Sequence, residues 1–265
     1  MPHDQRIFVE AICRYCRAHG IACEVKSGGW LVVMERDGQR RLAFGYDIGL
    51  NSAIAHRIAN DKSASSDVLA LSDIPCIPHT MFLSPRLGNH IVPEGSRDEM
   101  LALLRTHPDG LVIKPNEGTS GRSVFRVETA SDLDSAVSEI FSSHLSLAIS
   151  PYIEIADEIR VTLLDDLPRV VYRKQRGSDW RHNLEFGAEP VLLEQGDARE
   201  ACVALAIRAA HSIGIRFASV DVVRVGTEWK VLEINSGVMM ETLGKLHPEL
   251  VHATYTAALD KVFGV

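Results

Sequence analysis

Residues 112–124 read VIKPNEGTSGRSV, two apolar runs joined through a lysine and a glycine-rich turn. The first run ends at Lys114, and the turn contains the small residues Gly118, Thr119, Ser120 and Gly121. Small residues let backbone N–H groups approach an anion closely, and the lysine places a cation beside them. The stretch therefore predicts a strand–loop–strand phosphate site, although a β-hairpin with a flexible tip has the same pattern.

Two further apolar runs, 219–223 (SVDVV) and 229–235 (WKVLEIN), predict a hairpin that carries hard oxygen ligands. Alternation along a strand places Glu233 and Asn235 on one face, and Asp221 lies on the neighbouring strand. Two carboxylates and an amide suit Mg²⁺, with Mn²⁺ as an alternative. An acidic pair on a half-exposed sheet is the other interpretation. The apolar strands disfavour it, because an unpaired buried charge is costly.

Between these regions, residues 149–154 (ISPYIE) predict an apolar linker that can hold an adenine by backbone hydrogen bonds. A carboxylate just beyond the linker can accept hydrogen bonds from ribose hydroxyls. Basic side chains then gather within 171–187 of an otherwise acidic chain. Such a run is usually a solvated face, but beside a nucleotide site it compensates the charge of phosphates.

Composition excludes several classes of protein. The chain has 265 residues and a net charge of -7, which disfavours nucleic acid as the main partner because phosphate backbones require a basic face. No apolar stretch approaches the roughly 20 residues of a membrane span, and the N-terminus does not read as a signal peptide, so we expect a cytoplasmic protein with no membrane partner.

The sequence has neither a P-loop nor a dinucleotide fingerprint. Its five cysteines, which include a C-x-x-C pair at Cys13 and Cys16, are expected to be reduced and mostly buried.

Hydrophobic periodicity predicts helices and short strands along the whole chain. The N-terminal pattern predicts a helix over 5–19 and then three strands, over 21–25, 30–35 and 41–44. A later helix is predicted over 131–141, with Ser131 as its cap. These patterns together indicate a mixture of helices and hairpins.

Taken in this order, the segments resemble the ATP-grasp superfamily, in particular its carboxylate–amine ligases such as ribosomal-protein S6 glutamate ligase, cyanophycin synthetase and glutathione synthetase. The resemblance runs from Asn51 to Met240 and rests on five motifs. The motifs are Asn60-Asp61-Lys62, the Lys114 strand with its loop, Asp157-Glu158-Ile159-Arg160, Arg181-His182-Asn183, and Asp221 with Glu233-Ile234-Asn235.

The resemblance implies an α+β ATP-grasp fold, in which two α/β subdomains clasp ATP. We expect an N-terminal substrate-side unit over 1–74, a lid subdomain over 75–149 and a catalytic subdomain over 150–265. The N-terminal helix and meander differ from the βαβ pattern usual before an ATP-grasp domain. The substrate therefore cannot be taken over from the relatives.

The resemblance also implies roles for individual residues. Contacts to ATP are expected from Lys62, Lys114, Gly118, Thr119, Ser120, Gly121, Tyr152, Ile153 and Glu158, with Glu158 on the ribose. Mg²⁺ is expected at Asp221, Glu233 and Asn235. Contacts near the γ-phosphate and the acyl group are expected from Arg160, Arg181 and Asn183.

The implied activity is phosphorylation of a small-molecule carboxylate to an acyl phosphate, which an amino acid or another amine then attacks to form an amide. A carboxylate–thiol ligase, a small-molecule kinase and a non-catalytic ATP-binding regulatory protein are the alternatives. The segment Asn235-Ser236-Gly237 is shorter than the usual motif after the metal strand and lacks its proline. This departure leaves the acceptor open, and the resemblance also allows a homodimer.

Overall fold

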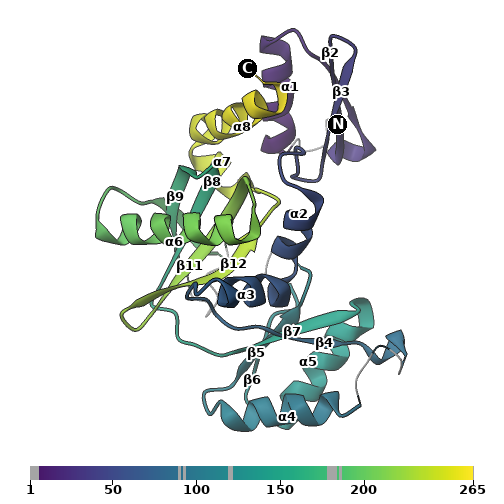
Figure 1. The fold of residues 1–265 in the computed structure, drawn as a ribbon, viewed down its shortest axis with the longest axis vertical. Helices are drawn as coiled ribbons and strands as arrows, with labels where there is room; N and C mark the ends of the chain where they lie inside the picture. Colours follow the sequence, from purple (N-terminus) through teal and green to yellow (C-terminus); the bar gives the residue numbers. More distant parts are fainter. Residues whose placement is uncertain are drawn as a thin grey trace.

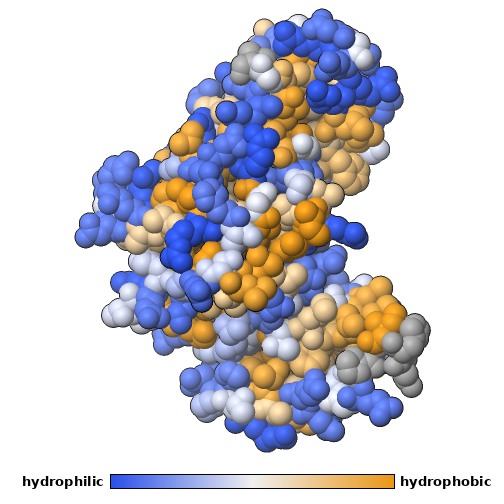
Figure 2. Space-filling model, in the orientation of Figure 1, coloured by the Kyte–Doolittle hydropathy of each residue, from blue (hydrophilic) through white to orange (hydrophobic). Residues whose placement is uncertain are grey.

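The computed structural model describes residues 6–88, 91, 94–118, 122–177, 184 and 187–264, and these residues form three antiparallel sheets (Figure 1). The molecule is elongated (Figure 2). A small sheet lies toward one end, a four-stranded sheet lies at the other, and a five-stranded sheet lies between them (Figure 1). Among the described residues, no helix is both long enough and apolar enough to cross a membrane.

The N-terminal unit consists of α1 (Ile7–Ala18) and the meander β1 (Ala22–Lys26), β2 (Leu31–Arg36) and β3 (Gln39–Phe44), with a short 3₁₀ turn, η1 (Ser27–Gly29), between the first two strands. The helix and the three strands predicted for this region are confirmed within one or two residues at most ends. Asp37 and Gly38 both adopt positive φ between β2 and β3, as the tight hairpin turn requires.

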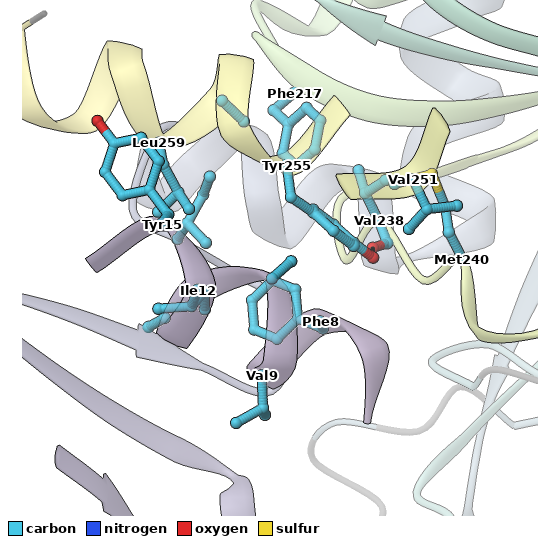
Figure 3. Close-up of a cluster of buried hydrophobic side chains, with 14 of the residues drawn as sticks. Phe8, Val9, Ile12, Tyr15, Phe217, Val238, Met240, Val251, Tyr255 and Leu259 are labelled. Atoms are coloured by element: carbon cyan, nitrogen blue, oxygen red, sulfur yellow. Dashed lines mark hydrogen bonds between the residues drawn. The ribbon is translucent and has the colours of Figure 1, made fainter. Parts of the chain in front are cut away.

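The first helix shares its core with the last one. Phe8 of α1 packs edge-on against Tyr255 of α8 (Pro248–Phe263), with 5.3 Å between the ring centroids (Figure 3). The Tyr255 hydroxyl donates to the carbonyl of Val238 at 2.8 Å. Glu241, at the start of α7 (Glu241–Leu246), accepts hydrogen bonds from the Tyr46 hydroxyl and the backbone N–H of Ile7. The N-terminal unit thereby holds the segment that follows the predicted metal strand.

The central sheet has the strand order β10-β9-β8-β11-β12. Its strands are β8 (Asp157–Leu164), β9 (Leu167–Gln175), β10 (Glu189–Leu192), β11 (Phe217–Val225) and β12 (Glu228–Asn235). An apolar core joins it to the helices α2 (Ala53–Asn60), α3 (Lys62–Leu71) and α6 (Asp197–Ile213). Alternate strand residues such as Val161 and Val220 enter this core, so their neighbours point to the opposite face.

The remaining sheet has the order β4-β7-β5-β6, and we call it the lid sheet. Its strands are β4 (Thr80–Leu83), β5 (Leu111–Pro115), β6 (Phe125–Val127) and β7 (Ser146–Pro151). The 3₁₀ turn η2 (Pro85–Leu87) follows β4, and the helices α4 (Ser96–Thr106) and α5 (Ala130–Ser143) share an apolar core with the sheet. Leu111, Ile113 and Ile149 point into that core, which leaves the other face of the lid sheet for a ligand.

Some local predictions are wrong. Helix α5 is capped by Thr129 rather than Ser131, because Thr129 and Asp132 form a reciprocal capping box. All five cysteines are free thiols, but only Cys16 and Cys202 are buried. The elements β10 and α7 were not predicted, since both are too short to show a clear period.

Candidate active site

The central sheet carries a buried cluster of charges on the face opposite its apolar core. Arg160 and Asp221 are directly opposite each other in the β8–β11 register. The Arg160 guanidinium donates from Nε and Nη2 to the two Asp221 oxygens, both at 2.6 Å. Lys174 of β9 donates to the same carboxylate at 2.9 Å and also to Glu158. Two cations and two carboxylates therefore satisfy one another.

Burial makes this cluster electrostatically strong. Asp221 has no exposed surface, and burial alone would raise the pKa of its carboxyl group. The adjacent charges of Arg160 and Lys174 outweigh that effect and hold the pKa of Asp221 well below its usual value. Burial and the Arg160 charge lower the pKa of Lys174. The carboxylates of Asp221 and Glu158 raise it by more than this, so the pKa of Lys174 is above its usual value. Asp221, Lys174 and Arg160 are therefore charged at neutral pH.

Glu233 and Asn235 lie beside this cluster, on the neighbouring strand β12. Glu233 is opposite Asp221 in the register, and the Asn235 amide donates to the Glu233 carboxylate at 3.3 Å. The prediction that Glu233 and Asn235 share a face is thus confirmed. Their strand is irregular, because a bulge shifts the register between Asp221 and Val222.

The donor chemistry of these residues fits Mg²⁺, since all three offer hard oxygen ligands. Asp221 already accepts three hydrogen bonds, two of them on Oδ2, so a metal ion would have to share this carboxylate with Arg160 and Lys174. Within the described ranges, no group of three or more His, Cys, Asp or Glu side chains is arranged to hold a metal ion. The metal ligands stay a prediction.

The lid sheet presents Lys114 toward this region. The Lys114 side chain is almost fully buried, and burial lowers its pKa to about 8. Glu233 raises the pKa of Lys114 and Lys62 lowers it, which places both charges near its ammonium group. Within the part of the chain that the structure describes, the ammonium group makes no hydrogen bond or ion pair. A buried cation without such a partner is an unusual and costly feature, and it indicates an anion site.

Lys62 is held at the start of the glycine-rich loop. Its ammonium group donates to the carbonyls of Gly118 at 2.9 Å and Asn116 at 3.4 Å. Asn116, which is fully buried, accepts two hydrogen bonds from Ser63 and donates to Asp61 at 2.7 Å. The start of α3 is thereby fastened to the end of β5. The charge of Lys62 is thus directed at carbonyls at the start of the loop, and its contact with ATP stays a prediction.

Two buried side chains near the lysines were missed by sequence reasoning. Among the described residues, the hydroxyl of Ser65 and Nε2 of His79 have no hydrogen-bond partner. Ser65 lines a small pocket together with Ala59, Asn60, Lys62, Gly118, Glu233, Ile234 and Asn235. The sequence offered a signal only for Ser65, which is three residues from Lys62. That spacing does not reveal that the side chain is buried.

The linker predicted to hold adenine follows β7 directly. The backbone N–H of Tyr152 donates to the Gly110 carbonyl at 2.9 Å. The guanidinium carbon of Arg126 lies 3.7 Å from the centroid of the Tyr152 ring. Beyond Ile153, a cleft of about 430 Å³ opens between the linker and β9. It is lined by Glu154, Ile155, Ala156, Asp157, Arg173, Lys174, Gln175 and Arg176.

The geometry thus brings together most of the predicted site residues. Lys114 lies on the lid sheet and Gly118 follows it, Lys62 begins α3 and reaches Gly118, and the central sheet carries Glu158, Arg160, Asp221, Glu233 and Asn235. Thr119, Ser120, Gly121, Arg181 and Asn183 fall outside the described residues, so their predicted roles are not tested.

Comparison with protein families matches residues 59–248 to the RimK-like ATP-grasp domain. This chain belongs to the RimK-like ATP-grasp family. Probable alpha-L-glutamate ligases from Legionella pneumophila (strain Corby) and Enterobacter sp. (strain 638) are each 28% identical over 199 residues, which cover 74% of this chain. A probable alpha-L-glutamate ligase from Xanthomonas oryzae is 30% identical over 181 residues, or 67% of this chain. The matched parts are only 57–62% of these relatives' own lengths.

Solved structures show the same fold. D-alanine–D-alanine ligase from Bacillus anthracis, solved with ATP, matches with a TM-score of 0.60 and 18% identity over 81% of this chain and 68% of its own. A bifunctional glutathione synthetase from Pasteurella multocida matches with a TM-score of 0.52 and 14% identity over 93% of this chain and 44% of its own. The predicted superfamily and its α+β ATP-grasp fold, a fold that binds ATP, are confirmed. The predicted unit boundaries of this RimK-like chain stay predictions.

Proposed function

We propose that this RimK-like chain is an ATP-dependent ligase that activates a carboxylate as an acyl phosphate and joins it to an amine. The observation that carries the proposal is Lys114, a buried lysine without an ion pair among the described residues, whose pKa is lowered by burial and by the charge of Lys62 and raised by that of Glu233. A triphosphate would give this cation the anionic partner that it otherwise lacks. The names of the relatives support L-glutamate as one of the substrates.

The proposed nucleotide site runs from the linker to the glycine-rich loop. Tyr152 and Ile153 would hold the adenine, and Glu158 the ribose. The phosphates would lie between Lys62 and Lys114, under the loop of Gly118, Thr119, Ser120 and Gly121. When bound, Mg²⁺ neutralises phosphate charge, and Glu233 and Asn235 would hold it, with Asp221 as the third ligand.

Arg160 is suited to the γ-phosphate although it already pairs with Asp221. It uses Nε and Nη2 for that carboxylate, so its Nη1 is left to donate to a phosphate oxygen. Arg181 and Asn183 are proposed at the same end of the site. Such a reaction depends on positioning and charge neutralisation rather than on a protein nucleophile.

The proposed chemistry has two steps. A carboxylate oxygen attacks the γ-phosphorus of ATP, the bond to the β-phosphate oxygen breaks, and ADP leaves. An amine then attacks the acyl carbon, inorganic phosphate leaves with the electrons of the acyl C–O bond, and the amine loses a proton to give an amide. Because water also attacks acyl phosphates, the lid has to exclude it.

The proposal is tested by incubating the chain with ATP, Mg²⁺ and L-glutamate, alone and with the other amino acids. We expect release of ADP rather than AMP, and a hydroxamate when hydroxylamine is added to trap the acyl phosphate. Lys114→Met should abolish turnover, whereas Lys245→Met, which changes an exposed lysine of α7, should not. Tight ATP binding with no release of ADP in any mixture of amino acids would contradict the ligase and favour a regulatory ATP-binding protein. A stable phosphorylated product would favour a kinase, and product formation only with a thiol would favour a carboxylate–thiol ligase.

A further inference from the structure

Asn116 is a fully buried residue directly after β5, between Lys114 and the glycine-rich loop, and the proposed mechanism gives it no role. Its side-chain oxygen accepts hydrogen bonds from the backbone N–H of Ser63 at 3.1 Å and from the Ser63 hydroxyl at 3.0 Å. Its side-chain nitrogen donates to the Asp61 carboxylate at 2.7 Å and to the sulfur of Met81 at 3.4 Å. An amide has two donor and two acceptor positions, so the full hydrogen-bonding capacity of this side chain is used.

The main chain of Asn116 also joins the lid sheet to α3. Its N–H donates to the carbonyl of Ser146 on β7 at 3.3 Å, and its carbonyl accepts from the backbone N–H of Lys62 at 3.2 Å. The Lys62 ammonium group donates to the same carbonyl at 3.4 Å. Helix α3 lies where the lid sheet meets the central part of the molecule (Figure 1). These contacts therefore fix the first residue of α3 relative to the lid sheet.

The helix does not need Asn116 in order to form. Oδ1 of Asp61 caps α3 by accepting from the backbone N–H of Ala64 at 2.8 Å, and only Oδ2 accepts from Asn116. The cap at Asp61 would therefore start the helix at Lys62 without Asn116. What Asn116 adds is the attachment of this first turn to the strand that carries Lys114.

The attachment holds two like charges close together. The charge of Lys62 lowers the pKa of Lys114, so the two ammonium groups repel each other. In the free protein the hydrogen bonds of Asn116 act against this repulsion. A ligand with several negative charges benefits from the arrangement, because both cations are in place before it binds.

We propose that Asn116 is a positioning residue for the phosphates of the nucleotide: it holds Lys62 beside the strand of Lys114, so that both ammonium groups face one polyphosphate. This inference rests on the proposed nucleotide site and adds a residue that does not itself touch the ligand. Asn116 acts through Lys62, so its contribution to binding depends on the Lys62 charge. A residue that only stabilised the fold would affect binding equally with or without that charge.

The test is a double-mutant cycle on ATP affinity, measured by calorimetry with Mg²⁺ but without amino acids. Asn116→Ala should weaken ATP binding about tenfold in the otherwise wild-type protein, the effect of roughly one buried hydrogen bond. In the Lys62→Met background the same substitution should change the affinity less than about twofold. Asn116→Ser keeps a hydroxyl that can replace one of the lost hydrogen bonds, so its affinity should lie between those of Asn116→Ala and the wild type.

Asn51 offers a matched control outside the proposed site. Its amide accepts from the backbone N–H groups of Arg216 and Phe217 at 3.0 and 2.9 Å and donates to the Phe217 carbonyl at 2.8 Å. Asn51→Ala should lower the urea concentration at the midpoint of unfolding, as Asn116→Ala does, yet leave ATP affinity unchanged. A similar loss of affinity in both variants would overturn the inference.

An equal loss of affinity on Asn116→Ala with and without the Lys62 ammonium group would also overturn it, because Asn116 would then serve the fold alone. Unchanged ATP affinity in Lys62→Met would overturn it even if no Asn116 variant folds. Failure of the proposed function is distinct from these results. It would appear as ATP binding without ligase turnover, and the cycle would still be measurable. Absence of any nucleotide binding would overturn both.

Discussion

The central sheet and the lid sheet both bury charge, but they treat it differently. On the central sheet, Asp221 is enclosed by Arg160 and Lys174, and both of its oxygens accept hydrogen bonds. On the lid side, Lys114 is almost fully buried, yet it has no ion pair among the described residues, and His79 nearby has an unsatisfied nitrogen. The difference indicates that the central cluster stabilises the fold even without a ligand, whereas the lid-side groups obtain a partner only when a ligand binds.

The two regions should therefore respond differently to substitution. Removing one member of a satisfied buried cluster leaves an uncompensated charge and destabilises the protein. Removing a group that lacks a partner in the free protein should leave stability unchanged or improve it, while ligand binding is lost. Binding and unfolding measured on the same variants separate the two roles.

The largest effect is expected for Asp221→Asn, because Arg160 and Lys174 would stay buried without their shared carboxylate. We expect the free energy of unfolding in the absence of nucleotide to fall by roughly 3–5 kcal/mol, measured by urea denaturation. Asp165→Asn is the control, since Asp165 pairs with Arg216 on the surface and should cost less than about 1 kcal/mol. Similar losses in the two variants would show that the central cluster does not stabilise the fold.

Lys114→Met should have the reverse effect. ATP binding should weaken at least tenfold, which corresponds to the roughly 1.5–3 kcal/mol of a hydrogen bond to a charged group. The free energy of unfolding should stay the same or rise, because a buried cation is removed. Calorimetry with ATP and urea denaturation provide the two readouts. A Lys114→Met protein that binds ATP normally, or that loses several kcal/mol of stability, would assign Lys114 to the fold instead.

The pH dependence of binding gives a third test. Burial lowers the pKa of Lys114 to about 8 in the free protein, whereas an unfolded lysine titrates near roughly 10.4. A bound triphosphate favours the charged form, so ATP affinity should fall as the pH rises through about 8. Stability without ATP should rise between the folded and unfolded pKa values, since the unfolded chain binds the extra proton there. Affinity that does not change across this range, or that changes equally in Lys114→Met, would contradict the assignment.

The smallest effect contrasts two serines of α3. The Ser63 hydroxyl donates to Asn116 at 3.0 Å, whereas the Ser65 hydroxyl has no partner among the described residues and lines the pocket. We expect Ser63→Ala to cost about 1 kcal/mol of stability, the contribution of one hydrogen bond. Ser65→Ala should be neutral for stability and weaken ATP binding a few-fold. Thermal unfolding and ATP titration of both variants check this, and a stability loss in Ser65→Ala alone would reverse the interpretation.

Local patterns were enough to predict most helices and strands, whereas the ATP-grasp fold was predicted from the resemblance to that superfamily. The strand that ends at Lys114 and the hairpin that carries Asp221 and Glu233 follow from apolar periodicity alone. The Thr129–Asp132 capping box was also readable, because a threonine followed three residues later by an acid is its signature. The prediction of Ser131 overlooked that spacing.

What could not be predicted depends on pairing between distant strands. Arg160 and Asp221 are 61 residues apart, and only the β8–β11 register brings them together. The isolation of His79 likewise depends on how α3 packs against the start of β4, which no local pattern describes. Sequence motifs therefore singled out Glu158, Arg160 and Asp221, but not Lys174 as their partner or which of these groups would already be paired.

The most direct measurement is the transfer of ¹⁸O from substrate to phosphate. The chain is incubated with ATP, Mg²⁺ and a pool of amino acids, including L-glutamate, whose carboxylates are labelled with ¹⁸O. Mass spectrometry then determines the label in the released inorganic phosphate. We predict one ¹⁸O atom in each phosphate, because the carboxylate oxygen that attacks ATP leaves with the phosphoryl group. Unlabelled phosphate released together with ADP, or formation of AMP, would contradict the acyl-phosphate ligase.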